Sequence, residues 1–343
     1  MSGSQKVAVI GASGYTGEEL LRALLRHPNI SITAITSRQQ AGQPLARVLG
    51  PSAPPTDLVF QNLAPDAVAA CADVFFLALP HGVAAEYAVP LLKAGKTVLD
   101  LSADFRLKST ALYQEYYKAA HPAPALLQES VYGLPELYRE KLKQARLIAC
   151  PGCYPTSAIL ALAPALRHKL VRHETIIVNS LSGISGAGKK ADTLYSFCER
   201  DENLAPYSVP RHRHIPEIEQ ELSCVAGGAV TLSFTPHLVP VVRGMLTTCC
   251  ATLTAPLTQE QAQKIYETDY AGERFVPVLP SDQLPETRRV MHTNACEVAV
   301  RCDPRTNRLF CFSALDNLGK GAALQALQAF NVRFGFNEAT GLV

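Results

Sequence analysis

The residue whose type and position most clearly suggest reactivity is Cys153, in the segment Cys150-Pro-Gly-Cys-Tyr-Pro-Thr-Ser157. A short apolar run typical of a strand precedes this segment, Pro151 and Gly152 turn the chain, and an apolar run typical of a helix follows. The thiol is therefore expected at a helix N-terminus, where unpaired backbone N–H groups and the helix dipole stabilise an anion. Such a position lowers a cysteine pKa and predicts a nucleophilic thiolate.

Two other interpretations of this cysteine remain open. Cysteine is often a small buried apolar residue with no reactivity. Cys150 and Cys153 also form a C-x-x-C pair, which can be a redox pair or half of a zinc site. A second C-x-x-C is missing, because Cys249 and Cys250 are adjacent, so we expect no metal site.

A histidine pair offers the proton transfer that thiol chemistry needs. The segment Arg211-His-Arg-His-Ile-Pro-Glu217 enters an expected helix at Pro216. His214 is the preferred general acid and base, with Glu217 one turn away to orient it, and His212 is the alternative.

A glycine-rich loop, Gly11-Ala-Ser-Gly-Tyr-Thr-Gly17, lies between an expected strand and an expected helix. Glycines allow backbone N–H groups to approach a pyrophosphate, whose charge the helix N-terminus stabilises. The spacing departs from the strict G-x-G-x-x-G fingerprint, so the strand–loop–helix context carries the prediction. The expected dinucleotide-binding residues of the loop are Gly11, Ser13, Gly14, Tyr15, Thr16 and Gly17.

The end of the second expected strand indicates which dinucleotide binds. NAD sites usually place a carboxylate there to bond the ribose hydroxyls. This chain has Thr36-Ser37-Arg38 instead. A hydroxyl at Ser37 and a guanidinium at Arg38 suit a 2′-phosphate, so we predict NADP(H) as the cofactor.

Three further segments carry groups that can hold an anionic substrate. Arg106 follows an expected strand, where open α/β sheets bind ligands, and Arg243 lies between two expected strands. The loop Ser182-Gly-Ile-Ser-Gly-Ala-Gly-Lys-Lys190 is rich in glycine and donors but lacks the Walker spacing. The expected substrate-binding residues are Arg106, Ser182, Gly183, Lys189 and Arg243, although each arginine can equally form an ordinary ion pair.

The elements that position these residues fall into two patterns. In the first half, strands alternate with helices, which indicates an open parallel sheet. The expected strands are 6–10, 30–36, the apolar run within 73–82, and 97–102, and the expected helices are 18–26 and 84–94. After Cys153, expected strands follow one another closely, at 175–181, 230–238, 245–253, 296–302 and 309–315, with a hairpin turn at 303–307.

The predicted fold class is therefore α/β, with a Rossmann-type parallel-sheet domain and an α+β domain containing a mixed, mostly antiparallel sheet. A last amphipathic helix, 321–334, is expected to pack on the first domain with Gly335 as its cap. The expected domains are 1–152 with 318–343, which binds NADP, and 153–317, which binds substrate and oligomerises. Residues 39–55 and 201–216 are expected to be loops.

Composition narrows the class of protein. A chain of 343 residues is long for one core, and 48% hydrophobic with 18% charged residues is typical of a globular protein. Because 32 Lys and Arg nearly balance 30 Asp and Glu, we expect no nucleic-acid or membrane partner. A strand pattern begins at Lys6, so we expect no signal peptide and a cytoplasmic location.

The assembled motifs resemble the N-acetyl-gamma-glutamyl-phosphate reductase family, NADP-dependent enzymes of arginine biosynthesis related to aspartate-semialdehyde dehydrogenase. The resemblance covers essentially the whole chain, and Pro151-Gly-Cys-Tyr-Pro-Thr156 with His212-Arg-His-Ile-Pro-Glu217 is its most specific part. The other matching segments are Gly11–Gly17, Ser102–Arg106, Val131–Glu136, Ser182–Gly188 and Asp316–Gly321.

The resemblance implies roles for these residues. Cys153 would attack the acyl phosphate to form a thioester, which hydride from NADPH reduces, with His214 as acid and base. Asn317, Gly319 and Lys320 would lie beside the nicotinamide, and the protein would form a dimer or tetramer. The alternatives are an aspartyl-phosphate reductase, a non-redox thiol hydrolase or acyltransferase, and a nicotinamide-sensing regulator.

Overall fold

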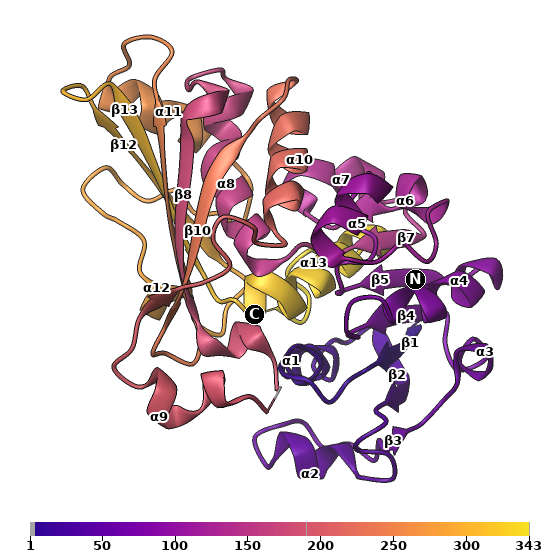
Figure 1. Cartoon of the computed structure of the whole chain (residues 1–343). Coiled ribbons are helices and arrows are strands. Elements are labelled where there is room, and N and C mark those ends of the chain that lie inside the picture. The colour runs from indigo at the N-terminus through magenta and orange to yellow at the C-terminus, as the bar shows by residue number, and fades with distance from the viewer. Residues whose placement is uncertain (1–3, 190, 343) are drawn as a thin grey trace. The chain divides into compact units, whose positions relative to one another are not determined.

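The chain folds into two structural units, each built on its own sheet (Figure 1). The computed structural model describes residues 4–189 and 191–342. The first unit comprises Met1–Pro151 and Ala322–Val343, and the second comprises Gly152–Gly321.

The first unit contains a seven-stranded sheet in the order β3-β2-β1-β4-β5-β7-β6. Every strand pairing in this sheet is parallel, which confirms the predicted Rossmann-type sheet. The strands are β1 (Gln5–Ile10), β2 (Ile30–Thr36), β3 (Phe60–Gln61), β4 (Val74–Leu77), β5 (Thr97–Asp100), β6 (Val131–Tyr132) and β7 (Leu147–Ala149). The strand order reverses between β1 and β4, so the carboxyl ends of these strands form the crevice where such sheets bind ligands.

Alternating side chains of β1 supply the cores on both faces of this sheet. Val7 and Val9 belong to one cluster, which includes α1 and α13, while Ala8 and Ile10 belong to a second, which includes α4. Burial on both faces explains why the strands read as continuous apolar runs. The helices of the unit are α1 (Tyr15–Leu24), α2 (Leu45–Leu49), α3 (Pro65–Val68), α4 (Ala84–Lys93), α5 (Thr110–Tyr117), α6 (Leu126–Glu129), α7 (Pro135–Leu142) and α13 (Leu324–Phe334).

The last helix returns to the first unit, as predicted, where α13 contacts α1 and α7. The predicted cap at Gly335 is confirmed by its left-handed φ of 69°. The start differs: Gly319–Ala323 form a π-helical turn, and the regular helix begins at Leu324. The expected loop 39–55 was also wrong in part, because it contains α2, whose five residues are too few to show a helical period.

The second unit contains a six-stranded sheet in the order β12-β13-β11-β8-β10-β9. Only β8 and β10 pair in parallel, so the predicted mixed, mostly antiparallel sheet is confirmed. The strands are β8 (Ile176–Gly183), β9 (Ala205–Pro206), β10 (Leu232–Val239), β11 (Met245–Thr252), β12 (Cys296–Asp303) and β13 (Arg308–Leu315). The short β9 and the start of α10 at Ile215 lie in the expected loop 201–216, which was wrong to that extent.

Helices cover one face of this sheet, and α8 packs on β11 and β13. Burial alternates along β11, where Met245, Thr247, Cys249 and Ala251 face the helices and the intervening residues are half-buried. The helices are α8 (Cys153–Arg167), α9 (Phe197–Arg200), α10 (Ile215–Ala226), α11 (Gln259–Asp269) and α12 (Thr287–Val290), with short 3-10 turns at His173–Thr175, Ile184–Ala187 and Thr193–Tyr195.

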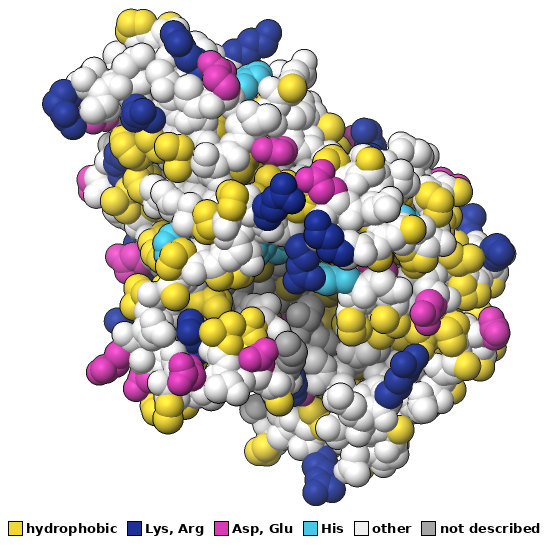
Figure 2. All heavy atoms as spheres, viewed as in Figure 1, with side chains coloured by type: hydrophobic (Ala, Val, Ile, Leu, Met, Phe, Trp, Pro, Cys, Tyr) yellow, Lys and Arg dark blue, Asp and Glu magenta, His cyan; other side chains and the backbone are white. Residues whose placement is uncertain are grey.

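Charged side chains of both signs occur on the face shown in Figure 2, as the near-neutral composition implies. Within the described ranges, no helix combines the length and apolar character that a bilayer span requires.

Candidate active site

Cys153 is the first residue of α8, and the half-buried thiol therefore lies at a helix N-terminus, as predicted. The N-cap is Gly152, which has no side chain to bond the first-turn N–H groups, and the first turn contains no acidic residue. The helix end therefore keeps the partial positive charge that stabilises a thiolate.

Glu217 fixes the turn that precedes this cysteine. Its Oε1 accepts a hydrogen bond from the backbone N–H of Gly152 at 3.0 Å. The carboxylate lies in the first turn of α10 and is 1% exposed. Sequence reasoning assigned Glu217 to His214 and did not foresee this link, which joins residues far apart in the chain.

The two candidate histidines lie in different environments. His212 is buried among the rings of Tyr154, Tyr207 and Phe234, and its Nδ1 accepts a hydrogen bond from the His214 backbone N–H at 3.1 Å. Burial, with a smaller effect of Arg213, lowers the pKa of His212 to about 4, so this imidazole is neutral at pH 7. His214 is only partly buried.

The His214 ring centroid lies 4.9 Å from that of His212 and 5.9 Å from that of Tyr154, the residue after Cys153. The histidine pair is thus next to the first turn of α8.

Two tyrosines that sequence reasoning missed complete this cluster. The hydroxyl of Tyr207 donates to that of Tyr154 at 3.0 Å, and the hydroxyl of Tyr154 donates to the His237 carbonyl at 3.4 Å. Burial raises the pKa of both tyrosines, and negative charge on Cys153 raises it further. Both phenols therefore stay protonated and remain hydrogen-bond donors.

The segment Asp316–Gly321 approaches Cys153 from another direction. A Cβ at Gly321 would lie 2.8 Å from the Cys153 Cβ, a separation that real Cβ atoms do not show. Only glycine therefore fits beside the thiol here. The Asp316–Gly321 segment was recognised in the sequence as a family motif. Its spacing alone did not indicate that it contacts Cys153.

Asp316 and Asn317 organise two of the expected substrate-binding segments. Both carboxylate oxygens of the fully buried Asp316 bond the Nε of Arg243, at 3.2 and 3.1 Å. Asn317 accepts from the Gly244 N–H at 2.8 Å and donates to the Ser185 hydroxyl at 2.9 Å. Arg243, Asn317 and the loop after β8 are thus brought together.

The other residues of this group have different surroundings. Gly183 bonds the Gly244 carbonyl through its N–H at 2.9 Å, and a Cβ on it would lie 2.7 Å from the Val242 carbonyl oxygen. Ser182 is buried, Gly319 opens the π-helical turn, and Lys320 is fully buried with its ammonium 5.8 Å from the Phe275 ring centroid. Lys189 is exposed, and Lys190 lies outside the described residues.

Arg106 lies in the first unit and is engaged with the backbone. Its Nε donates to the Cys150 carbonyl at 2.7 Å and its Nη2 to the Leu101 carbonyl at 3.0 Å. It therefore braces the carboxyl ends of β5 and β7.

Cys150 is 1% exposed, and burial together with the charge of Asp100 raises its pKa. A protonated, buried thiol does not favour the redox-pair alternative.

The glycine loop of the first unit lines a cavity of about 320 Å³. Its lining includes five of the predicted cofactor residues and no carboxylate; these five are Gly11, Ser13, Gly14, Ser37 and Arg38. Tyr15, Thr16 and Gly17 are outside the lining and form the first turn of α1.

The glycines fit a bound pyrophosphate in different ways. A Cβ at Gly14 would meet nothing within 4 Å, so open space adjoins the N-terminus of α1. A Cβ at Gly17 would lie 2.6 Å from the Ala12 carbonyl oxygen, so this glycine allows the helix to pack on the loop.

The Ser13 and Ser37 hydroxyls bond each other at 2.8 Å, and Arg38 is exposed at the cavity. These groups fit a dinucleotide whose ribose carries a phosphate.

Asp104 holds one wall of this cavity. Its buried carboxylate accepts from the N–H groups of Gly82 at 2.7 Å and Ala85 at 3.2 Å. These residues precede and begin α4, next to the wall residues Ala78–Pro80 and Val83.

In the described part of the chain, no three His, Cys, Asp or Glu side chains gather as a metal site would require.

Comparison with known proteins agrees with this arrangement. Residues 6–145 match the family model "Semialdehyde dehydrogenase, NAD binding domain", and residues 153–317 match "Semialdehyde dehydrogenase, dimerisation domain". Aspartate semialdehyde dehydrogenase II from Vibrio cholerae shares the fold, with a TM-score of 0.75 and 19% identity over 96% of this chain and 98% of that chain.

Whole-chain relatives are considerably more similar. The N-acetyl-gamma-glutamyl-phosphate reductase of Akkermansia muciniphila is 49% identical, with 98% of both chains covered. That of Desulforamulus reducens is 48% identical, with 98% of this chain and 97% of the relative covered. The chain therefore belongs to the semialdehyde dehydrogenase family and, within it, to the N-acetyl-gamma-glutamyl-phosphate reductases.

Proposed function

We propose that this protein uses NADPH to reduce N-acetyl-gamma-glutamyl phosphate to N-acetyl-glutamate semialdehyde, with release of phosphate, as a step of arginine biosynthesis. The observation that carries the proposal is the thiol of Cys153 at an uncapped helix N-terminus, next to the buried Tyr154, the half-buried Tyr207 and a histidine pair. The names of the full-length relatives supply the substrate.

Cys153 is the proposed nucleophile. Its thiolate attacks the acyl carbon, the carbon–oxygen bond to phosphate breaks, and a thioester forms on the enzyme. The N-terminus of α8 stabilises the thiolate before attack, and backbone N–H groups there or in the loop after β8 can stabilise the oxyanion. Bound NADPH supplies the hydride that reduces the thioester carbonyl.

His214 is the proposed acid and base. It donates a proton to the oxygen as the thiohemiacetal forms and takes a proton back from that hydroxyl as the aldehyde leaves and the thiolate returns. His212 is less suitable, because its pKa of about 4 keeps it neutral and its Nδ1 is used by the backbone. Glu217 is proposed to hold the turn before Cys153.

The cofactor specificity follows from the cavity of the first unit. Ser37 and Arg38 offer a hydroxyl and a guanidinium to a 2′-phosphate, and the lining has no carboxylate that would repel it. The glycine loop and the N-terminus of α1 would hold the pyrophosphate. Asn317, Gly319 and Lys320 remain proposed contacts of the nicotinamide.

Substrate contacts are proposed for the second unit. Arg243, oriented by Asp316, is suited to the substrate carboxylate, and Lys189 is suited to the phosphate. Ser182 and Gly183 are the last residues of β8 and lead into the loop that carries Lys189. For Arg106 the two carbonyl contacts favour a positioning role at the end of β7.

A homo-oligomer is part of the proposal, because the family model of the second unit is a dimerisation domain. The sheet face opposite the helices carries partly exposed apolar side chains, including Ile177, which is 40% exposed, Phe310 and Phe312. We propose that this face pairs with a second copy.

The proposed location is the cytoplasm. All ten cysteines are free thiols, which suits that reducing compartment.

The test is phosphate-dependent oxidation of N-acetyl-glutamate semialdehyde with NADP, run beside aspartate semialdehyde. The proposal predicts turnover with the first aldehyde and at least tenfold lower efficiency with the second. Preference for aspartate semialdehyde would replace the proposed substrate, and turnover without any nicotinamide would replace the redox chemistry.

A further inference from the structure

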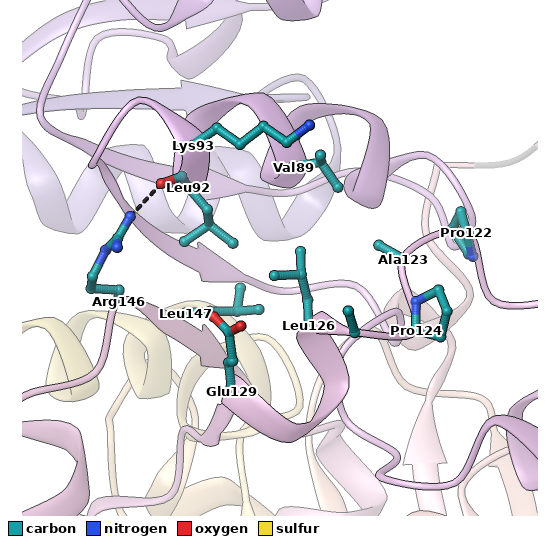
Figure 3. A pocket seen from close by; sticks show the side chains of 11 residues that line it. Val89, Leu92, Lys93, Pro122, Ala123, Pro124, Leu126, Glu129, Arg146 and Leu147 are labelled. Carbon is teal, nitrogen blue, oxygen red and sulfur yellow. Dashed lines mark hydrogen bonds between the residues drawn. The ribbon is translucent and has the colours of Figure 1, made fainter.

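A second pocket in the first unit is separate from the dinucleotide cavity and shares no lining residue with it. Its volume is about 470 Å³, within the range of small-molecule sites. Its floor is apolar and comes from α4, the Pro122–Leu126 segment and β7. Figure 3 shows Val89, Leu92, Leu126 and Leu147 directed into it.

Three charged side chains surround this apolar floor. Arg146 lies at one end of the pocket, where a guanidinium nitrogen donates to the Leu92 carbonyl (Figure 3). Glu129, at the end of α6, stands next to Leu147, and Lys93 ends α4. Within the described ranges, the Glu129 and Lys93 side chains form no hydrogen bond or ion pair.

The exposed charges of Glu129 and Lys93 contribute little to the stability of the fold, because even paired surface charges stabilise it only weakly. A ligand that matches the two charges next to the floor needs one anionic group for Arg146, one cationic group for Glu129, and an apolar body for the floor. We propose that this pocket binds a free α-amino acid with an apolar side chain. The carboxylate would bind near Arg146, and the ammonium would bind Glu129.

The helix α4 connects this pocket with the dinucleotide cavity. Val83 and Tyr87, at its beginning, line the dinucleotide cavity, whereas Val89, Leu92 and Lys93, towards its end, line the second pocket. The Asp104 carboxylate holds the start of the same helix through Gly82 and Ala85. An occupant that shifts α4 therefore changes the wall of the dinucleotide cavity, and binding at the two sites is coupled in both directions.

Binding is tested on the full-length protein by calorimetry, with L-leucine and L-phenylalanine as probes. A ligand of this size is expected to bind with a dissociation constant of roughly 1 mM. N-acetyl-L-leucine lacks the ammonium and is expected to bind several-fold more weakly. Because no turnover is measured, the result is independent of the proposed reductase activity.

Variants identify the site. Glu129→Gln and Arg146→Gln are each expected to weaken binding by up to about fivefold, and Ala125→Trp is expected to abolish it by filling the pocket. Glu115→Gln removes an exposed carboxylate from α5 and is the matched control, expected to bind as the wild type does. Absence of saturable binding by both probes, or binding that Ala125→Trp leaves unchanged, would overturn the proposal.

Coupling is tested by titrating NADP with and without saturating L-leucine. The expected result is a change of about fivefold in the dissociation constant of NADP, absent in Ala125→Trp. An unchanged constant would overturn the link through α4.

Discussion

The carboxylate of Glu217 accepts a hydrogen bond from the backbone N–H of Gly152, 3.0 Å away. Gly152 is the N-cap of α8, and the next residue is Cys153. The first turn of α10 therefore determines where the first turn of α8 begins. A buried carboxylate in this position can set both the direction and the electrostatic surroundings of the thiol.

Replacing Glu217 tests this relationship. Glu217→Ala leaves the buried Gly152 N–H without its acceptor, and we expect kcat and the rate of Cys153 alkylation by iodoacetamide to fall about tenfold or more. Glu217→Gln keeps a carbonyl acceptor and should recover much of both rates. If Glu217→Ala alkylates and turns over within twofold of the wild type, Glu217 does not position Cys153.

The histidine pair can be separated by substitution. We expect His214→Asn to lower kcat by about 10²- to 10⁴-fold, because it removes the general acid and base. His212→Asn should affect kcat much less. Steady-state kinetics of the two purified variants decides the matter, and the opposite ranking would exchange the two roles.

The buried His212 also predicts a pH dependence of stability. Its pKa is about 4 in the folded protein against an ordinary value of 6.5, so between these values the unfolded chain binds more protons. Stability should therefore fall as the pH drops from 6.5 to 4, with His212 contributing on the order of 1 to 3 kcal/mol.

Urea unfolding of the wild type and of His212→Gln over this pH range measures the contribution. The variant should lose less free energy of unfolding than the wild type. Equal losses in both proteins would show that His212 does not carry this pH dependence.

Cofactor choice is expected to depend on Arg38. Arg38→Gln should raise the KM for NADPH about tenfold and leave the KM for NADH nearly unchanged, because only NADPH carries the 2′-phosphate. Arg26→Gln, an exposed arginine outside the cavity lining, is the matched control. A similar rise in KM for both cofactors would show that Arg38 does not recognise the 2′-phosphate.

Much of the fold could be predicted because its strands have strong local patterns. The strand at Ile30–Thr36 was predicted with its observed boundaries, and the strand–turn–helix around Cys153 was predicted from local residues alone. Short helices such as α2 and α6 were missed, because four or five residues do not complete a recognisable period.

The features of the candidate site that the sequence did not predict depend on contacts between residues far apart in the chain. Glu217 bonds Gly152 across 65 residues, and Gly321 lies against Cys153 from the other end of the second unit. The phenol of Tyr207 meets Tyr154 across 53 residues. No spacing rule predicts such contacts, since the tertiary fold creates them. Arg106 shows the reverse case, because its residue type suited an anionic ligand whereas its guanidinium donates two hydrogen bonds to backbone carbonyls.

The proposed reaction depends above all on Cys153 as the nucleophile. The deciding measurement is the rate of NADPH oxidation by Cys153→Ser with N-acetyl-gamma-glutamyl phosphate, alongside NADPH binding by fluorescence titration. We predict turnover at least about 10³-fold below the wild type, with NADPH affinity unchanged. Turnover close to that of the wild type would contradict covalent catalysis by this thiol.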